Sequence, residues 1–575
     1  MLRRFVGGVG LGTWLLHREA PPAIDPLAHD APIAFVLSPL VGTPLTTSAK
    51  FAVVAKSPLT NRLNDALSSS HFALAAKRAE MDALVIAGRR EAPSVLVIDD
   101  GAVRFESADD LWGRSAAEAN ALLKDRLGSR FSCAIIGPAG ERLVRFATVS
   151  HDRRHAGRGG MGAVLGSKNI KAIAVAGSQR VEVADPQGMI ELARDLSKRS
   201  FGPATAKYRE LGTVANLLTF NRFAALPTRN FQQGTFESAD ALSGESLNEA
   251  RRVARNSCAA CTIGCEHIYA SPEGEVRLEY ESLFALGPLC GIGDRDAVLS
   301  AARFCDEAGI DTISAGATVA FAMECAERGL IDDPSLRFGA GDRMLALLRQ
   351  IARREGIGHL LADGTRRAAE ILGGDASDFA PHVKGLEIPG YEPRALQTMA
   401  LGFAVGSRGA DHNRSGAYEV DFSNKVDRRD VGPESVGLAI ETEDRAAVMD
   451  SLILCKFLRG VFTDYFAESA EMLRLVTGWD MTADELRTTA SRIVTAKKLF
   501  NIREGWTAAE DTLPRRFLSQ SIPGVGDRES SLTQERLQSL VAAYWRERGW
   551  TDEGLVPSGV VQGLNLADLD HRLPE

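Results

Sequence analysis

Three cysteines lie within eight residues of one another, so a metal group held by their thiolates would fix the local fold. Cys258, Cys261 and Cys265 have the spacing C-x-x-C-x-x-x-C in the segment NSCAACTIGC. A segment with this spacing can fold around one face of an iron-sulfur cube, which cysteine thiolates ligate. A zinc site and ordinary buried cysteines are the alternatives, and for zinc the only nearby additional ligand is His267.

A cubane cluster needs a fourth ligand, and the pattern alone does not select it. Cys290, Cys305 and Cys325 lie in apolar segments with helical periodicity, where free cysteine behaves as a small hydrophobe. Cys455 follows a short apolar run and precedes a lysine, in DSLILCKF. Three of the eight cysteines are clustered, which resembles a metal site more than a disulfide framework and indicates a reducing cytoplasm.

The hydrophobic pattern changes along the chain. Between residues 33 and 150, short β-branched runs alternate with Gly, Pro and Asp, as in IAFVLS, KFAVVAKSP, DALVIAG and SVLVIDDG, which is typical of strands. Beyond Pro186 the apolar residues recur with helical periodicity. This periodicity predicts helices over residues 294–306, 313–328 and 343–354.

The predicted fold class is therefore α+β. A chain of 575 residues, 45% of them hydrophobic, can bury several cores. We expect a β-rich domain at residues 1–178 and two mainly helical domains at 179–381 and 382–575. A net charge of −8 gives no reason to expect a nucleic-acid partner, and no run of 18 apolar residues predicts a membrane span.

The N-terminus has two interpretations. Met1 to Arg4 followed by the apolar run from Phe5 to Leu16 resembles an export signal. The glycines of GGVGLGTWLL belong instead to a folded domain if the run packs inside the protein. We expect the second, with residues 5–16 inside the N-terminal domain.

A glycine-rich segment, RRHAGRGGMGAVLGSKN, covers residues 153–169. Its glycines allow backbone amides to approach an anion, and its arginines supply charge-assisted hydrogen bonds. The segment lacks the GK[ST] ending of a Walker loop and the GxGxxG register of a dinucleotide fold. We interpret it as a phosphate-binding segment, with a plain glycine-rich turn as the alternative.

Four acid or imidazole side chains stand out as candidates. Asp306 and Asp311 flank Gly309, which predicts a helix that ends and turns its last side chains toward a ligand, although such pairs are also common at solvated helix ends. Glu281 and His412 are single ionisable residues, which are usually structural. If both face one pocket, desolvation raises the glutamate pKa and the pair can share proton transfer and substrate orientation.

In their order along the chain, several strings resemble the aldehyde:ferredoxin oxidoreductase family: GLGTWLL, VGTPLTTSAKFAVVAKSPLT, AGRGGMGAVLGSKNIKAIAV, CAACTIGC, EYESLFALG, DEAGIDTISAG and LPRRF. The resemblance covers nearly the whole chain. It implies an N-terminal β-rich domain that forms the base for two pterins holding tungsten or molybdenum, with the two helical domains closing over them. It also implies a [4Fe-4S] cluster with Cys455 as fourth ligand, Mg²⁺ bridging the pterin phosphates, and a homodimer as the assembly.

The resemblance assigns roles to residues at matching motif positions. Glu281 is the implied general base, and His412 the implied hydrogen-bond partner of the carbonyl oxygen. The residues implied to contact the pterin cofactor are Lys50, Ser69, Arg154, His155, Gly157, Arg158, Asp306, Ile310, Asp311, Asp411, Asp450 and Leu454.

The sequence departs from the family pattern at several places. Lys50 stands where members often have an arginine, and Ile453 replaces the glycine of a D-x-x-G-L-C motif. The loop at residues 67–70 reads LSSS rather than the usual Asn-Ser-Gly-Gly. Ser300 and Arg303 occupy the positions of an interfacial iron site, so we expect no third metal site. The chain also begins later than is usual, which suggests a truncated gene model or an abbreviated β domain.

The resemblance implies oxidation of a small aldehyde to a carboxylic acid, with electrons leaving through the cluster to ferredoxin or an iron-sulfur partner subunit. One alternative is a branch that works in the reductive direction on an acid or thioester. The other is a non-catalytic iron-sulfur electron-transfer subunit, an idea motivated by Lys50, Ile453 and the altered serine loop.

Metal analysis of the purified protein separates an enzyme from an electron-transfer subunit. We expect iron together with tungsten or molybdenum, because the cofactor carries the chemistry of the reaction. Iron without either heavier metal, in protein purified from cells supplied with both, would instead support the electron-transfer subunit.

Overall fold

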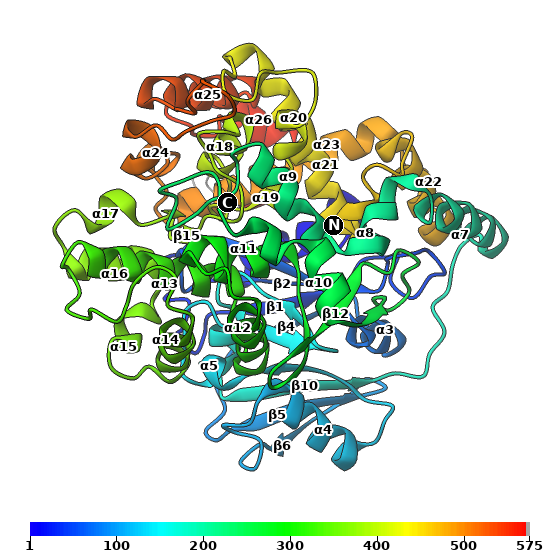
Figure 1. Ribbon diagram of the computed structural model, residues 1–575. Coiled ribbons are helices and arrows are strands. Elements are labelled where there is room, and N and C mark those ends of the chain that lie inside the picture. The colour runs from blue at the N-terminus through cyan, green and yellow to red at the C-terminus, as the bar shows by residue number, and fades with distance from the viewer. Residues whose placement is uncertain (571–575) are drawn as a thin grey trace.

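A computed structural model describes residues 1–570 of the chain, and its first 176 residues form two sheets (Figure 1). The first sheet is antiparallel with the order β3-β2-β1-β4. Its strands are β1 (Ile33–Val36), β2 (Lys50–Lys56), β3 (Leu63–Ser69) and β4 (Ala83–Ile86). The second sheet has the order β6-β5-β10-β7-β8-β9, in which β5 and β10 run parallel. Its strands are β5 (Ser94–Asp99), β6 (Ala102–Ser107), β7 (Ser132–Ile136), β8 (Val149–His151), β9 (Arg154–Ala156) and β10 (Ile170–Ala176).

One hydrophobic core joins the two sheets. The alternating apolar residues of β1, β2, β5 and β10 contribute to it, together with residues of α3 (His71–Arg78) and α6 (Met161–Gly166). The rings of Phe51 and Phe72 are 5.0 Å apart within this core. The β-rich N-terminal region is thus confirmed.

Strand β3 was not predicted, because Asn64 and Asp65 interrupt its apolar pattern although both are fully buried. The prediction of a loop at residues 67–70 is therefore wrong. Residues 67–69 end β3, where Ser69 pairs with Lys50 across the ladder. Ser70 caps α3 by accepting a hydrogen bond from the backbone N–H of Phe72.

Helices dominate the chain after β10, beginning with α7 (Pro186–Ser200). The three predicted helices are confirmed as α12 (Arg295–Ala308), α13 (Thr312–Glu327) and α14 (Gly341–Arg353). A small sheet of β11 (Arg252–Asn256), β12 (Glu266–Ser271) and β13 (Gly274–Arg277) interrupts them and was not predicted. Residues on both sides of position 382 belong to one hydrophobic core, so the domain division there stays a prediction.

Helices of several lengths position the site between the sheets and the helical layer above them (Figure 1). They are α8 (Ala206–Leu211), α9 (Asn216–Arg222), α11 (Tyr280–Leu286), α19 (His412–Ser415), α20 (Tyr418–Asp421), α21 (Val436–Leu452), η6 (Lys456–Leu458) and α23 (Ala483–Arg503).

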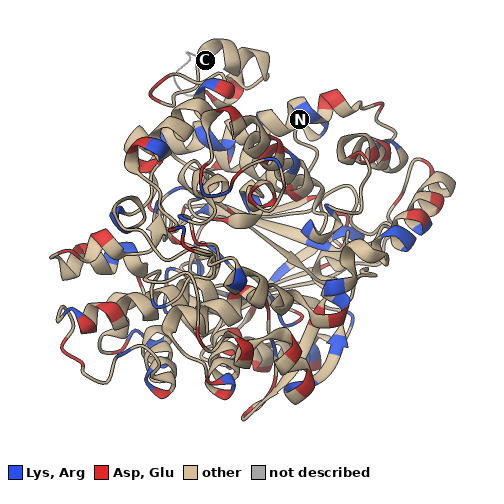
Figure 2. Ribbon diagram, turned by 45° about the horizontal axis from the view of Figure 1, so that its top comes forward, with Lys and Arg blue, Asp and Glu red and all other residues tan. Residues whose placement is uncertain are grey.

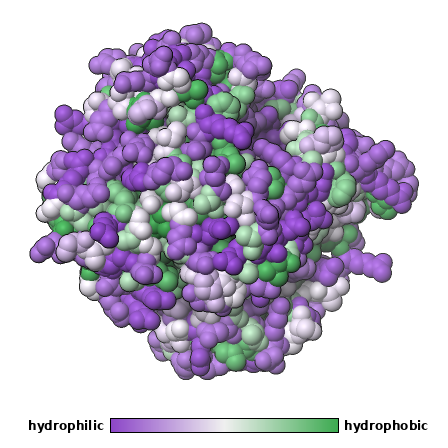
Figure 3. Space-filling view, viewed as in Figure 1, coloured by the Kyte–Doolittle hydropathy of each residue, from purple (hydrophilic) through white to green (hydrophobic). Residues whose placement is uncertain are grey.

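The visible surface is polar. Figure 2 shows basic and acidic residues interspersed along the ribbon, and on the face shown in Figure 3 apolar residues are scattered among hydrophilic ones. Within residues 1–570, no helix combines the length and the apolar character that crossing a lipid bilayer requires.

Helix α2 (Gly8–Glu19) lies inside the fold, where it packs on the first sheet and on α21. Val9, Leu11 and Leu16 are buried, so residues 5–16 are part of the folded N-terminal region, as expected. A Cβ atom on Gly12 would lie 2.5 Å from Cγ2 of Val54 on strand β2. Glycine at this position is what allows the helix to approach the sheet so closely.

Helix α21 ends in an unusual conformation at Ile453, which has a left-handed φ of 61°. A β-branched residue is disfavoured there by roughly 1–2 kcal/mol, and glycine is preferred. The Ile453 side chain is fully buried in a cluster with Val9 and Leu16 of α2. The apolar contact with α2 therefore offsets the backbone strain that the missing glycine would have avoided.

Gly8→Ala should destabilise the contact between α2 and α21. Gly8 has φ of +41°, and an added Cβ would lie 2.5 Å from the carbonyl oxygen of Ser451 and 2.6 Å from that of Asp450. Crowding of this kind costs roughly 1–3 kcal/mol, so the thermal unfolding midpoint should fall. Gly563→Ala is the matched control, since nothing lies within 4 Å of its added Cβ. Equal midpoints for the two variants would contradict the close packing of Gly8.

Candidate functional site

A cavity of about 760 Å³ lies between the N-terminal sheets and the helical part of the chain. Its wall draws residues from β2, β9, α9, α11, the end of α12, α19, α20 and η6. A cavity of this volume is at the upper end of the range that holds cofactors and drug-sized ligands.

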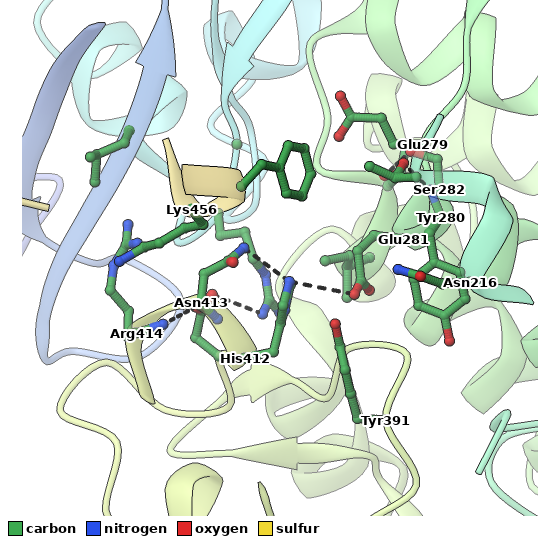
Figure 4. Close-up of a pocket in the computed structure, with 18 of the residues that line it drawn as sticks. Asn216, Glu279, Tyr280, Glu281, Ser282, Tyr391, His412, Asn413, Arg414 and Lys456 are labelled. Atoms are coloured by element: carbon green, nitrogen blue, oxygen red, sulfur yellow. Dashed lines mark hydrogen bonds and ion pairs between the residues drawn. The ribbon is translucent and has the colours of Figure 1, made fainter. Parts of the chain in front are cut away.

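Glu281 and His412 face each other across a small gap in this wall. Glu281 lies in the first turn of α11, and His412 begins α19, whose N-terminus is capped by Asp411. His412 Nε2 is 3.6 Å from Glu281 Oε1, and the two side chains point toward each other in Figure 4. The Gly390 N–H donates to Glu281 Oε2 at 3.0 Å. The Tyr391 ring stacks on the imidazole, with centroids 4.9 Å apart.

Burial keeps both members of this pair uncharged at neutral pH. It raises the pKa of Glu281 to about 8 and lowers the pKa of His412 to about 3. Glu281 Oε1 and His412 Nδ1 are buried and have no hydrogen-bond partner among residues 1–570. Buried polar atoms left without partners indicate a surface built to receive a ligand.

Aromatic rings extend this wall. Phe220 of α9 stacks on Tyr280 at 5.1 Å and meets Tyr391 edge-on at 5.1 Å. Tyr418 of α20 lies 5.0 Å from Tyr391. No sequence pattern indicated this grouping, because its members come from separate segments between residues 220 and 418.

Part of the glycine-rich segment packs against the rest of the protein, and phosphate binding by this segment stays a prediction. It forms β9, a turn and α6, and most of its glycines approach the protein's own chain rather than an anion. An added Cβ would lie 2.1 Å from Asn64 Oδ1 at Gly159, and 2.1 Å from the Arg145 carbonyl oxygen at Gly160. Gly157 lines the cavity and has nothing within 4 Å of an added Cβ. Tight packing therefore requires glycine at positions 159 and 160, whereas Gly157 lines the cavity.

The first acidic motif lies at the cavity as predicted. Helix α12 ends before Gly309, which is left-handed with φ of 73°, and Asp306 and Asp311 both line the wall. Asp306 Oδ1 is 3.2 Å from His155 Nε2. Asp311 caps α13 and lies 3.4 Å from Arg158 Nε. Both carboxylates therefore face the cavity, and their role in binding a ligand stays a prediction.

The second acidic motif is surrounded by cations of the chain. Asp450 lies 2.8 Å from Lys456 Nζ and 3.2 Å from Arg414 Nη1. Arg414 also pairs with Asp65 of β3, which lies beside Arg408. Sequence reasoning missed Asp65, Arg408 and Arg414, because Asp65 lies in the strand that was not predicted and its cationic partners are distant in the chain.

Most predicted site residues meet at this cavity, and their chemical roles stay predictions. Those that line it are Lys50, His155, Gly157, Arg158, Glu281, Asp306, Ile310, Asp311, Asp411, His412, Asp450 and Leu454. Ser69 and Arg154 lie outside the wall. Ser69 donates to the Ala49 carbonyl oxygen at 3.0 Å, and Arg154 pairs with Glu266. Both lie next to Cys258, one of the clustered cysteines.

The four predicted cysteine ligands lie near one another. The neighbouring Cys261 thiol lowers the pKa of Cys258, and Arg154 and Lys50 lower it further. Burial raises the pKa of Cys265, and the neighbouring thiols of Cys455 and Cys258 add to the rise. Cys455 is thus the candidate fourth ligand that the structure brings to the other three.

A threonine pair holds the two cysteine segments together. The Thr47 N–H donates to the Ala260 carbonyl oxygen at 2.6 Å, and Thr47 Oγ1 accepts from the Cys455 N–H at 3.2 Å. Thr46 Oγ1 accepts from the Thr262 N–H at 3.0 Å.

His267, the candidate additional ligand of a zinc site, is engaged in other contacts. The two ring nitrogens of His267 lie 3.1 Å from Asn248 Oδ1 and 3.2 Å from the Arg209 carbonyl oxygen. Within residues 1–570, no group of three or more His, Cys, Asp and Glu side chains is set to hold a metal ion. A four-iron cluster takes one thiolate per iron, so its ligands stand farther apart than those of a single ion.

Two family models match the chain. The model of the aldehyde ferredoxin oxidoreductase N-terminal domain matches residues 1–177, and that of domains 2 and 3 matches residues 191–566. The tungsten-containing aldehyde ferredoxin oxidoreductase of Pyrococcus furiosus is 36% identical over 585 aligned residues, which cover 99% of this chain and 95% of the relative. The tungsten-containing aldehyde ferredoxin oxidoreductase of Thermococcus kodakarensis is 36% identical over 588, with the same coverage.

More distant relatives share the length and the fold. The WOR-like subunit of an aliphatic sulfonate oxidoreductase from Pyrococcus furiosus is 28% identical over 609 aligned residues, covering 99% of this chain and 94% of the relative. Among solved structures, the active site complex BamBC of benzoyl coenzyme A reductase with 1,5-dienoyl-CoA superposes with a TM-score of 0.84 at 22% identity, covering 99% and 94% of the two chains.

The raised pKa of Glu281 makes a prediction about stability. Between its ordinary value of 4.5 and its folded value of about 8, the folded protein keeps a proton that the unfolded chain has released. This contribution to stability is complete below pH 4.5 and is lost as pH rises to about 8. Glu281→Gln removes the titration, so the thermal midpoint of the parent protein should fall relative to that of the variant between about pH 5 and pH 8. A constant difference over this range would show that Glu281 is ionised throughout.

Proposed function

Because the chain belongs to the aldehyde ferredoxin oxidoreductase family, we propose that it oxidises an aldehyde to the corresponding carboxylic acid at a tungsten or molybdenum bis-pterin centre. Its relatives show that it is an oxidoreductase of the tungsten-pterin class. The observation that carries the finer proposal is the pair of Glu281 and His412, which is buried, uncharged and aimed into a cavity of about 760 Å³.

The residues present fit such a cofactor. The cavity is large, and its wall holds buried charges of both signs, with Arg408 Nε among the buried atoms without a partner. Asp306 and Asp311 on one side and Asp450 on the other would accept hydrogen bonds from the polar edges of the two pterins. Arg158 and His155, which line the cavity, would face pterin phosphates, whose negative charge Mg²⁺ would balance. When bound, the metal centre supplies the two-electron oxidation of the aldehyde carbon.

The roles of the chain's own residues follow from their protonation. The ionised form of Glu281, a minority below its pKa of about 8, would take the proton from the water that attacks the aldehyde, and this carboxylate is a stronger base than that of an ordinary glutamate. Neutral His412 would donate its single ring N–H to the carbonyl oxygen, where negative charge develops. The aromatic wall around Tyr391 would keep bulk water from this gap.

The overall reaction balances as aldehyde plus water giving carboxylic acid, two protons and two electrons. We propose that Cys258, Cys261, Cys265 and Cys455 hold a [4Fe-4S] cluster through which the electrons leave one at a time. The acceptor would be ferredoxin or an iron-sulfur partner subunit. The relatives' names support a ferredoxin-linked reaction, and the grouping of the four thiols supports the cluster.

The two alternatives are less well supported. A non-catalytic electron-transfer subunit has no need for the buried pair of Glu281 and His412. An enzyme that reduces an acid or thioester would use the same cavity residues for the reverse reaction. Initial rates measured in both directions, with oxidised and with reduced ferredoxin, distinguish the two reactions.

Substitution of the pair tests the proposed roles. Glu281→Gln should lower turnover by roughly 10²–10⁴-fold, the usual contribution of a positioned acid-base group. His412→Ala should cost about 2.7–4 kcal/mol of transition-state stabilisation, as the loss of one oxyanion donor does. Aldehyde-dependent viologen reduction measures both effects, with iron and tungsten or molybdenum determined in each preparation.

Glu275→Gln is the matched control, since this glutamate is exposed on β13. It should turn over like the parent protein. Near-parental turnover in both Glu281→Gln and His412→Ala, at full metal content, would refute the assigned roles while leaving the family assignment intact.

A further inference from the structure

The cysteine loop, residues 258–265, lies at the surface of the protein. Its three thiols are half-buried, whereas Ala260 and Thr262 between them are exposed. Strand β11 leads directly into the loop as an outer strand of the sheet β11-β12-β13. A group held by these cysteines is therefore close to solvent on this side.

Two arginines flank the loop without carboxylate partners. Arg252 and Arg255 are exposed on β11, opposite Tyr269 and His267 of β12. Gly264 lies inside the loop, and a Cβ atom added to it would lie 3.7 Å from Arg255 Nε. Neither arginine forms an ion pair within residues 1–570, since the neighbouring Glu266 is buried and pairs with Arg154.

Apolar side chains and a third arginine complete the surface. Val253, between the two arginines, is 51% exposed, and Phe201 is 58% exposed. Ser200 Oγ lies 2.7 Å from Thr262 Oγ1, which attaches the Phe201 turn to the cysteine loop. The Arg209 guanidinium covers the Phe201 ring at 4.3 Å, and its hydrogen bonds go to Gly202 and Thr205 rather than to a carboxylate.

We propose that these five residues, Phe201, Arg209, Arg252, Val253 and Arg255, form a docking surface for a small acidic iron-sulfur protein that binds transiently. This inference rests on the proposed function, because the cluster beneath the loop would be the electron donor. The chain has a net charge of −8, so an acidic carrier is repelled by the molecule as a whole. Three arginines without carboxylate partners, grouped at the electron exit, supply the local attraction that steers the carrier to it.

The composition of the surface favours a transient complex over a permanent subunit. Its apolar part consists of two side chains, whereas permanent subunit contacts are larger and more apolar. Transient electron-transfer complexes are small and rely on charge for their encounter rate. Salt screens such attraction, with a Debye length of about 10 Å at 0.1 M.

Charge reversal tests the surface. The double variant R252E/R255E and the parent holoenzyme are compared for binding of a small acidic [4Fe-4S] ferredoxin by isothermal titration calorimetry at 50 mM and 500 mM NaCl. We expect the variant to raise Kd at low salt by roughly 10–100-fold and to lose most of the salt dependence. Ferredoxin reduction should slow accordingly at subsaturating ferredoxin, while aldehyde-dependent methyl viologen reduction changes less than about twofold, because a small acceptor needs no docking surface.

The control is R349E/R367E, two exposed arginines on α14 and α16 (Gly364–Leu372), which lie outside the five-residue surface and to the left of β12 in Figure 1. This variant should bind ferredoxin like the parent. Ferredoxin binding by R252E/R255E within twofold of the parent at 50 mM NaCl overturns the proposal, as does a ferredoxin complex that 500 mM NaCl does not weaken, which indicates a permanent subunit. Absence of aldehyde-dependent viologen reduction in the parent refutes the proposed function instead, and the binding comparison still decides the docking surface.

Discussion

The cavity depends on a network of buried charges that joins distant parts of the chain. Arg414, just inside α19, pairs with Asp65 of the N-terminal sheet and with Asp450 at the end of α21. Lys497 of α23 lies 3.3 Å from Asp65. A buried charge that loses its partner is strongly destabilising, so none of these residues can be buried without the others. The network therefore ties the sheet to the C-terminal helices and fixes the wall between them.

The local pattern of the sequence was sufficient for most of the regular elements. Strands β1, β2, β4 and β5 and helices α12, α13 and α14 lie where β-branched runs and helical periodicity predict them. The end of α12 at Gly309 was also readable, because a left-handed residue there requires glycine. Strand β3 was not, since the buried Asn64 and Asp65 owe their place to partners elsewhere in the chain. A pattern of neighbours cannot show partners that are hundreds of residues away.

The sequence indicated which residues gather at the site, but not which contacts require each of them. The resemblance brought together Glu281, His412 and the acidic motifs, and the structure places them on one wall. The glycines after Arg158 were readable as special, yet their spacing does not reveal whether an anion or another strand approaches them. At Gly159 it is Asn64, from the strand that the sequence did not predict. The missed strand is thus the reason why the packing role of Gly159 could not be predicted.

The turn at Ile453 connects the two halves of the site. After this left-handed residue the backbone of Cys455 is extended, with φ of −73° and ψ of 136°. Neighbouring side chains of an extended segment point to opposite sides, and here Leu454 and Lys456 line the cavity while Cys455 lies with the other cysteines. Lys50 lines the cavity as well, and the thiols of Cys455, Cys258 and Cys261 outweigh its burial and raise its pKa. A single peptide segment therefore separates the cavity from the cysteines, and the strain at Ile453 directs its path.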